Sequence, residues 1–313
     1  MTSYLFSLLV LVSIAGIAAL SLNLQWGLTG MVNFGLFGFY MLAAYVYAQV
    51  AASGASPWLA LGAALALTGV AGALTSLISL RLADDYLAIV TLGFAECLRL
   101  VAIHEEWLTR GSLGIADIAR PVTGDGAFLA LCLAALLLSF GLLETIARSP
   151  LGRAARALRD DPLVAATAGK DVLWLRVKLF GIGAAVTGVA GALHASYYQY
   201  IDPTQFGPIL TAYAFMGVII GGRGSNRGVI LSAFTVILLL EGTRFLNDHV
   251  GWLAPAQLAA LRLMLIGVGL ILALIYRPQG LVPEYRREVG LPDVRLPDGT
   301  AAADAARPGE LAR

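Results

Sequence analysis

The sequence has few charged residues, and they are missing altogether from its first quarter. Only 13% of the 313 residues are charged, whereas 58% are hydrophobic and the mean hydropathy is +0.79. A soluble domain usually has about 25% charged residues. The first 80 residues contain no lysine, arginine, aspartate or glutamate, and the first charge is Arg81. This composition excludes a disordered chain and an ordinary soluble enzyme, and it indicates a polytopic membrane protein.

Cysteine and histidine are scarce as well. Cys97 and Cys132 both lie inside apolar runs, which is typical of small buried hydrophobic residues and not of a disulfide or a metal pair. The three histidines, His104, His194 and His249, are scattered and form no local metal motif. The net charge of +1 is too small to indicate a basic surface that binds nucleic acid. We therefore expect no metal, no cofactor and no nucleic-acid partner.

Motifs of catalysis are also missing. The tripeptide Gly169-Lys170-Asp171 lacks the upstream glycine and the hydroxyl residue of a phosphate-binding loop. The chain has no H-E-x-x-H motif and no plausible catalytic triad. We therefore expect no ATP site, no catalytic residue and no enzymatic activity in this chain.

What the sequence has in abundance is long apolar runs. A helix that crosses the hydrocarbon core needs about 20 apolar residues. The runs of this kind are 4–22, 31–50, 58–80, 86–103, 127–147, 179–198, 207–221, 229–246 and 257–276. We predict an all-α transmembrane bundle of about nine spans (eight to ten) in one domain over residues 1–284. The tail 285–313 is predicted to be polar, disordered and cytoplasmic.

Three of these runs need a comment. The first lacks a basic region before it and is followed by further apolar sequence, so it is interpreted as a retained span and not as a cleaved signal peptide. Residues 31–50 are rich in glycine and aromatics and follow the polar break Asn23-Leu24-Gln25, and residues 207–221 are short. Either of the last two is a candidate for a broken or re-entrant segment, which requires burial in protein or a cavity.

The distribution of basic residues predicts the orientation in the membrane. The loop 148–178 holds seven of the 21 basic residues against three aspartates, whereas the loop 104–126 holds four acidic residues and two arginines. The first loop is therefore assigned to the cytoplasm and the second to the outside. Alternation of the spans then puts the C-terminus inside and the N-terminus outside.

The basic loop 148–178 has an ordered pattern of its own. Arginines recur at every third residue on one side of a short helix, and Asp161-Pro162 is a typical start of a second short helix that ends at Gly169. Two short helices joined at a corner form a rigid knob suited to docking, although an ordinary positive-inside loop remains an alternative. The residues assigned to docking are Arg153, Arg156, Arg159, Asp160, Asp161, Ala165, Ala166 and Gly169.

A second group of residues is assigned to a translocation path. Glu96 and Arg99 lie three residues apart inside a span, where ionisable residues are costly and are functional candidates. Asn33 lies among closely spaced glycines that allow tight backbone approach. The residues assigned to the path are Asn33, Gly35, Thr91, Glu96 and Arg99. A structural ion pair and simple helix packing are the alternatives.

One short sequence occurs twice. Thr68–Leu74 reads TGVAGAL, and the same seven residues recur at Thr187–Leu193. In the predicted topology the two helices run in opposite directions, as an inverted repeat requires. The alternative is that small-residue helix faces resemble one another because glycine and alanine allow close packing.

Taken together, several segments resemble one known family. They are Gly27–Gly35 through Tyr45, Leu80–Leu82, Tyr86–Phe94, Leu108–Ser112, the loop 149–170, Ala190–Leu193, Ile201–Pro203, Gly221–Ser225 and Arg277–Pro283. In this order and spacing they resemble the permease subunit of branched-chain amino acid ABC importers, specifically its LivM-like member. The resemblance covers about Asn23 to Pro283.

This resemblance implies a set of partners and a location. The partners are a second, LivH-like permease, two ATP-binding subunits and an extracytoplasmic solute-binding protein, and the location is the bacterial inner membrane, in contact with its lipids. The loop around Arg153–Gly169 matches the family's coupling helix, which docks onto the ATPase. The implied cargo is a small molecule, a branched-chain amino acid.

Some positions depart from the family pattern. Glycine is more usual where Arg110 and Asp84 stand, and an aliphatic residue where Arg223 stands. Related importers carry urea, short amides or other amino acids, so these solutes remain alternatives. The rival class is a stand-alone secondary transporter, for which Glu96 is the candidate ion-coupling carboxylate.

Overall fold

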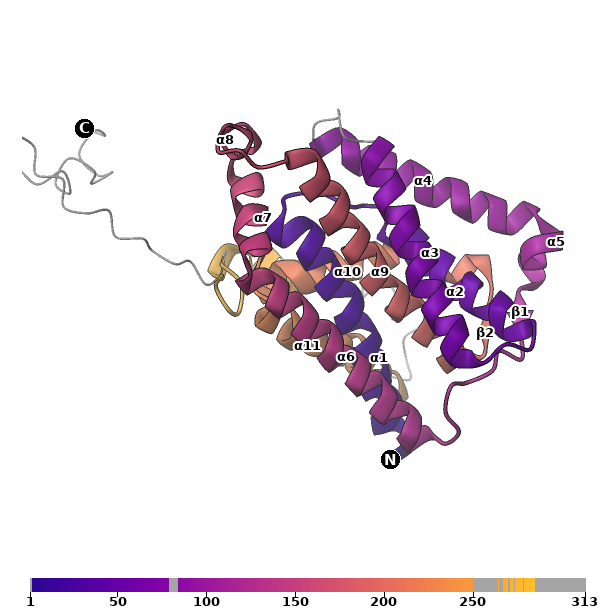
Figure 1. Ribbon diagram of the computed structural model, residues 1–313. Helices are drawn as coiled ribbons and strands as arrows, with labels where there is room; N and C mark the ends of the chain where they lie inside the picture. The colour runs from indigo at the N-terminus through magenta and orange to yellow at the C-terminus, as the bar shows by residue number, and fades with distance from the viewer. Residues whose placement is uncertain are drawn as a thin grey trace, which may run out of the picture.

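The computed structural model describes residues 2–78, 84–249, 264, 267–269, 271–272, 274–277 and 279–284. These residues fold almost entirely as helices (Figure 1). The elements in chain order are α1 (Thr2–Leu22), the π-helical turn η1 (Asn23–Leu28), α2 (Leu36–Ala52), α3 (Pro57–Ile78), α4 (Asp84–His104), α5 (Glu106–Thr109), η2 (Gly111–Leu113), β1 (Ile115–Ala116), α6 (Asp125–Arg148), α7 (Pro150–Asp160), α8 (Pro162–Thr167), α9 (Val172–Tyr198), β2 (Tyr200–Ile201), η3 (Pro203–Gln205), α10 (Pro208–Gly221) and α11 (Asn226–His249).

The prediction of an all-α polytopic membrane protein is confirmed. Among the described residues, six helices are long and apolar enough to cross a membrane. They are Tyr4–Leu28, Pro57–Ile78, Tyr86–His104, Asp125–Arg148, Val172–Tyr198 and Pro203–Gly221. The shorter apolar helices Leu36–Ala52, Asn226–Leu240 and Gly267–Tyr276 coincide with three further predicted runs. The total of nine spans stays a prediction, since much of run 257–276 lies outside the described residues, as do Arg81 and the tail 285–313.

The two runs that were candidates for a broken segment, 31–50 and 207–221, have different structures. The first is broken as predicted: α1 continues into the π-helical turn η1, residues 29–35 are irregular, and α2 begins only at Leu36. Most of this irregular segment is buried in the protein, as a non-helical backbone at membrane depth must be. The second is an unbroken helix of 14 residues, α10, which Pro208 begins because proline suits the first turn of a helix.

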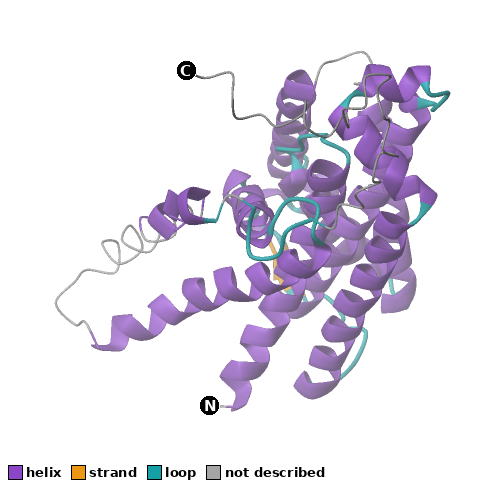
Figure 2. Ribbon diagram, turned by 90° about the vertical axis from the view of Figure 1, so that its left-hand side faces the viewer, coloured by secondary structure: helices purple, strands orange, loops and turns teal. Residues whose placement is uncertain are grey.

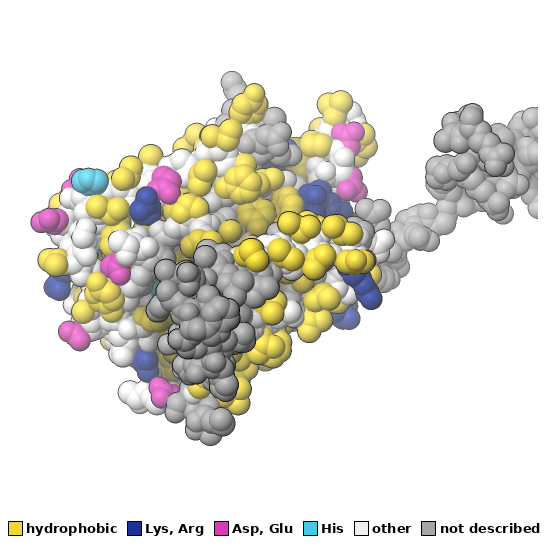
Figure 3. Space-filling model, turned by 180° about the vertical axis from the view of Figure 1, so that it is seen from behind, with side chains coloured by type: hydrophobic (Ala, Val, Ile, Leu, Met, Phe, Trp, Pro, Cys, Tyr) yellow, Lys and Arg dark blue, Asp and Glu magenta, His cyan; other side chains and the backbone are white. Residues whose placement is uncertain are grey.

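The loops meet at two opposite ends of the bundle. One end carries α7 and α8, and the other carries α5 and the two-stranded pair β1–β2 (Figure 1); they are called the α8 end and the α5 end below. Figure 3 shows the described charged side chains gathered toward these ends, with a largely apolar surface between them. This distribution is the one that a hydrocarbon layer between two aqueous layers requires.

The helices that carry the repeated sequence pack directly against each other. Gly69 and Gly72 of α3 lie against Ala185 and Ala184 of α9, so the two helices run antiparallel. A β-carbon at Gly69 would lie 3.1 Å from that of Ala185, and one at Gly72 would collide with Ala184. Close helix packing therefore accounts for the small residues of both copies, and the antiparallel course agrees with the predicted opposite directions.

At the α5 end two connections form a small pair of strands that the sequence did not predict. Ile115 pairs with Ile201 and Ala116 with Tyr200, in antiparallel register. The strands are the orange element in Figure 2, which otherwise shows helices and short loops. Arg120 ties the same connections to the end of α9, because its guanidinium donates to the carbonyls of Ser196 (3.2 Å) and Tyr197 (2.9 Å).

Candidate translocation site and coupling loop

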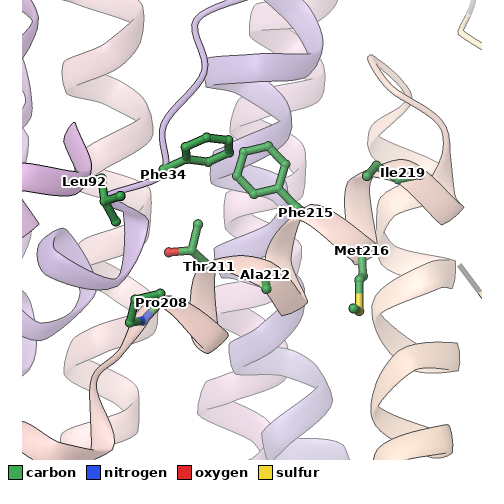
Figure 4. Close-up of a pocket in the computed structure, with 8 residues that line it drawn as sticks. All are labelled: Phe34, Leu92, Pro208, Thr211, Ala212, Phe215, Met216 and Ile219. Carbon is green, nitrogen blue, oxygen red and sulfur yellow. The ribbon is translucent and has the colours of Figure 1, made fainter. Parts of the chain in front are cut away.

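An apolar cavity lies where the broken segment faces α4 and α10 (Figure 4). Its volume is about 380 Å³. The side chains that line it are Phe34, Leu92, Pro208, Thr211, Ala212, Phe215, Met216 and Ile219. Thr211 brings the one hydroxyl in this set, and that oxygen already accepts a hydrogen bond from the backbone N–H of Phe37 (3.0 Å). The walls therefore suit an aliphatic group and offer nothing to a charge.

The broken segment places Phe34 in this cavity by contacts with α4. The backbone N–H of Phe34 donates to the hydroxyl of Thr91 (3.2 Å). Gly35 lies so close to α4 that a β-carbon there would collide with the backbone carbonyl of Thr91. Two residues that the sequence assigned to the path, Gly35 and Thr91, therefore stand behind the cavity wall and hold Phe34 and Leu92 in register.

Asn33 connects the same segment to the π-helical turn. Its side-chain amide donates to Gln25 Oε1 (2.8 Å), while its Oδ1 accepts from the N–H of Gly35 (2.9 Å). Gln25 in turn donates to the carbonyl of Phe180 on α9 (3.1 Å). Asn33 and Gln25 are fully buried, and buried amides need such partners. The polar break in the sequence thus supplies the hydrogen bonds that an irregular buried backbone demands.

Glu96 and Arg99 form the ion pair that their spacing suggests. Arg99 Nε lies 2.8 Å from Glu96 Oε2, and the two side chains are about one third exposed (31% and 33%). Leu92, Glu96 and Arg99 follow one another at i, i+4 and i+7, so they share one face of α4. The pair thus begins one helical turn beyond the cavity wall. Its assignment to the path stays a prediction.

The basic loop forms the two short helices predicted for it, α7 and α8. Ser149 caps α7, and Asp161 Oδ1 caps α8 by accepting from the N–H groups of Leu163 (2.8 Å) and Val164 (3.1 Å). Gly169 follows α8 in the left-handed conformation (φ +73°) that favours glycine. Leu163 and Val164 are 75% and 61% exposed, so α8 protrudes from its end of the bundle with an apolar tip (Figure 1).

The three arginines of α7 have different surroundings. Arg153 is exposed, Arg156 donates to the carbonyl of Ala147 (3.1 Å), and only 11% of the Arg159 side chain is exposed. Asp160 is exposed and lies 3.4 Å from Arg159 Nε. Of the small residues on α8, Ala165 is buried and Ala166 is exposed. The three basic side chains thus do not form a single exposed face on α7.

Arg159 faces the C-terminal end of the α1–η1 helix. Its guanidinium donates to the carbonyl of Gly27 (2.6 Å) and to Glu284 Oε2 (2.9 Å). Neither Gly27 nor Glu284 was singled out as functional from the sequence, because no local pattern places residue 284 beside residue 159. The bridge joins three segments that are far apart in the chain.

Arg223 occupies the same region. Its guanidinium lies over the ring of Trp26, 4.9 Å from the centroid, and donates to the Trp26 carbonyl (3.3 Å). Burial lowers the pKa of Arg223, and the positive charge of Arg159 lowers it further, while the negative charge of Glu284 acts in the opposite direction. Arginine nevertheless stays cationic in proteins. Two arginines therefore cap the carbonyl end of one helix, where cations are favoured.

Comparison with known proteins identifies the family. The family model described as "Branched-chain amino acid transport system / permease component" matches residues 4–274. The chain belongs to this family. Members similar to it include the high-affinity branched-chain amino acid transport system permease protein LivM of Salmonella typhimurium, 32% identical over 93% of this chain and 71% of that protein. LivM of Escherichia coli is 31% identical over the same shares.

A second kind of permease in this family is similar at lower identity. LivH of Escherichia coli is 25% identical over 72% of this chain and 80% of its own length. LivM is the more similar of the two in identity and in the share of this chain that is matched, which confirms the resemblance to the LivM-like members. No solved structure gives a significant match. Family membership and the six long apolar helices together establish a multi-pass membrane permease component.

Proposed function

We propose that this chain is the membrane-spanning LivM-type subunit of an ATP-binding-cassette importer for leucine, isoleucine and valine. Family membership supports the class of transporter. The observation that carries the substrate is the 380 Å³ cavity, whose described walls are aliphatic and aromatic apart from the Thr211 hydroxyl, which accepts a bond from the N–H of Phe37. Transfer of an aliphatic side chain from water into such a site is favourable in proportion to the apolar area that is buried.

The cavity also disfavours the alternative solutes. Urea and short amides have little or no aliphatic surface to place against these walls. A charged amino-acid side chain placed there would lack hydrogen-bond partners, which is costly. The aliphatic side chains of leucine, isoleucine and valine are therefore the groups that this cavity suits best, while the ammonium and carboxylate of the amino acid must find their partners outside these walls.

We place the α8 end in the cytoplasm. The elements at that end, which are α7, α8, the end of α6 and the connections beside them, carry basic residues that include Arg148, Arg153, Arg156, Arg159, Lys170, Arg223 and Arg227. The α5 end has acidic residues in excess, as the loop 104–126 illustrates. Basic residues favour the cytoplasmic side of a membrane. This orientation puts the segment 279–284 inside and, by extension, the C-terminal tail in the cytoplasm.

The partners follow from this orientation. The protruding α8, with its exposed Leu163 and Val164, is the surface we assign to an ATP-binding subunit. A LivH-like permease is expected beside α4 and α10, which carry the cavity on one side, and a solute-binding protein is expected at the α5 end. Hydrolysis in the ATP-binding subunits then supplies the energy, and this chain itself is no enzyme.

The rival class, a secondary transporter, loses support from one contact. Its candidate ion-coupling carboxylate, Glu96, is in an ion pair with Arg99 at 2.8 Å. The arginine on the same face of α4 already serves as the charge partner of this carboxylate. The geometry thus favours a structural pair over a proton carrier.

A substitution in the cavity tests the proposed substrate. Ala212→Asp puts a carboxylate among the apolar walls, and Ala52→Asp puts the same charge on the exposed end of α2. In the assembled complex we expect Ala212→Asp to abolish ATP-driven leucine uptake and Ala52→Asp to leave it unchanged. Uptake of leucine by the Ala212→Asp complex at the unmodified rate would refute the assignment of this cavity.

A further inference from the structure

The cavity wall and the coupling helix α7 are connected by an unbroken series of contacts through η1. The series starts at Arg159, which the sequence assigned to docking and which the structure turns inward. Its buried guanidinium spans two acceptors on different segments, Gly27 at 2.6 Å and Glu284 at 2.9 Å. The planar fork of arginine suits such a double contact, whereas lysine offers a single point charge.

The backbone of α7 also lies directly against the broken segment. A β-carbon at Gly30 would lie 3.2 Å from Arg159 Cγ and 3.4 Å from its Cα, and Gly30 has φ +82°. Little free space therefore separates α7 from the residues that leave η1. Movement of α7 away from η1 would break the bonds from Arg159 to the Gly27 carbonyl and to Glu284, and the loss of each bond is unfavourable.

The next contacts lead from η1 to the cavity. Trp26 precedes Gly27, and its ring lies 5.0 Å from the ring of Phe215 on α10. Phe215 lies 5.3 Å from Phe34 at an angle of 61°. Both phenylalanines line the cavity (Figure 4). Aromatic pairs at these distances and angles attract one another, so a displacement of Trp26 is transmitted to the two rings that form the wall.

The π-helical turn η1 has an alternative geometry, the ordinary α-helix that precedes it in α1. Six residues, Asn23–Leu28, form a wide turn at the end of α1, and such turns are rare and often occur at functional sites. The same turn carries Gln25, which holds Asn33 at 2.8 Å. A return of η1 to α-helical geometry would shift Trp26, Gln25 and the Asn33 segment together, which is the kind of two-state element that alternating access requires.

We infer that Arg159 is a positioning residue that couples α7 to the cavity: through Gly27 and Trp26 it makes the Phe34–Phe215 wall respond to the state of the ATP-binding subunit. This inference rests on the proposed function, because it presumes an ATPase docked at the α8 end. It assigns Arg159 a role inside the subunit and not in the docking contact itself.

Thiol cross-linking in the assembled complex tests the inference. The exposed Cys97 is replaced by alanine, Leu92 and Met216 of the cavity wall are replaced by cysteine, and the rate of reaction with a short bifunctional maleimide is measured with and without ATP. Phe34 and Phe215 are kept, because they carry the proposed coupling, and in this parent we expect ATP to change the rate by at least about fivefold, the lower end of coupling between sites. If that pair impairs assembly, cysteines at Leu92 and Ile219 report on the same cavity.

Arg159→Gln is then introduced into the parent. We expect the ATP-binding subunit to remain bound and to hydrolyse ATP, while ATP no longer changes the cross-linking rate, and we expect Arg159→Lys to restore only part of the response. Arg227→Gln removes an exposed arginine from the first turn of α11 and serves as the matched control. In this control we expect ATP to change the cross-linking rate as much as in the parent.

Two results would overturn the inference. An unchanged ATP response in Arg159→Gln would show that the wall does not depend on this bridge, and loss of the bound ATPase would place Arg159 in the docking contact. If the parent itself binds no ATPase, the proposed function fails and the inference falls with it, which distinguishes the two failures.

Discussion

At the scale of single residues, Gly35 behind the cavity wall has no space for a side chain, because it lies against the backbone of α4. Its backbone torsion (φ −91°) is open to any residue, but a β-carbon would collide with the Thr91 carbonyl. We predict that Gly35→Ala destabilises the folded protein by about 1–3 kcal/mol, the usual cost of overpacking. Thermal unfolding in detergent measures this. Gly93→Ala on α4, where a β-carbon meets open space, is the control, and equal melting temperatures for the two variants would contradict the contact.

Arg110 is the opposite case, a residue with a side chain at a position whose backbone favours glycine. It stands where the resemblance led us to expect glycine, and it has φ +61°, in the left-handed region that costs about 1 kcal/mol or more for residues with a β-carbon. We predict that Arg110→Gly raises the melting temperature. Arg110→Ala removes the same charge but keeps the β-carbon, so it is expected to give no gain. A similar rise in both variants would assign the effect to charge.

The residue scale also shows how far sequence reasoning reaches. Asn33 and Gly35 were singled out from an unusual density of glycine and polar residues inside an apolar run, and both shape the cavity. Phe34, which lines it, was passed over because one aromatic in a membrane span carries no local signal. Glu284 was missed for another reason: its partner Arg159 lies 125 residues away, and no pattern in the chain records such a contact.

At the scale of elements, the antiparallel seam between α3 and α9 is the clearest target. Glycine at position 72 lets the helices approach so closely that a β-carbon would collide with Ala184. We predict that Gly72→Ala lowers the unfolding free energy by about 1–3 kcal/mol. The same change at Gly62 of α3, which faces open space, is expected to be neutral. Alanine is the better helix former, so helix propensity cannot account for a loss of stability at position 72. Equal destabilisation by both variants would contradict the predicted role of the α3–α9 contact.

Elements defined by local chemistry were predicted best. The two helices of the basic loop follow from Asp161, Pro162 and Gly169, each of which acts within a few residues of its own position. The break before α2 follows in the same way from the polar residues after α1. The strands β1 and β2 have two residues each, too few for a pattern, and they form only because the folded bundle brings their loops together.

At the scale of the whole molecule, the low charge of the sequence reflects a division of labour. On the face shown in Figure 3 most described charges lie toward the two ends, and no group of three or more His, Cys, Asp or Glu residues that would hold a metal occurs among the described residues. Under the proposed function this chain provides the path and two docking ends, while other subunits supply the energy and most of the recognition.

The most direct test of this account is leucine uptake by proteoliposomes that contain the chain with its LivH-type partner, the ATP-binding subunits and the solute-binding protein. We predict that leucine uptake requires ATP on the side of the membrane that carries the ATP-binding subunits. We also predict that isoleucine and valine compete with leucine, and that uptake persists when the proton gradient is collapsed. Uptake that continues without ATP and stops with the proton gradient, or that proceeds equally well when this chain is left out, would contradict the account.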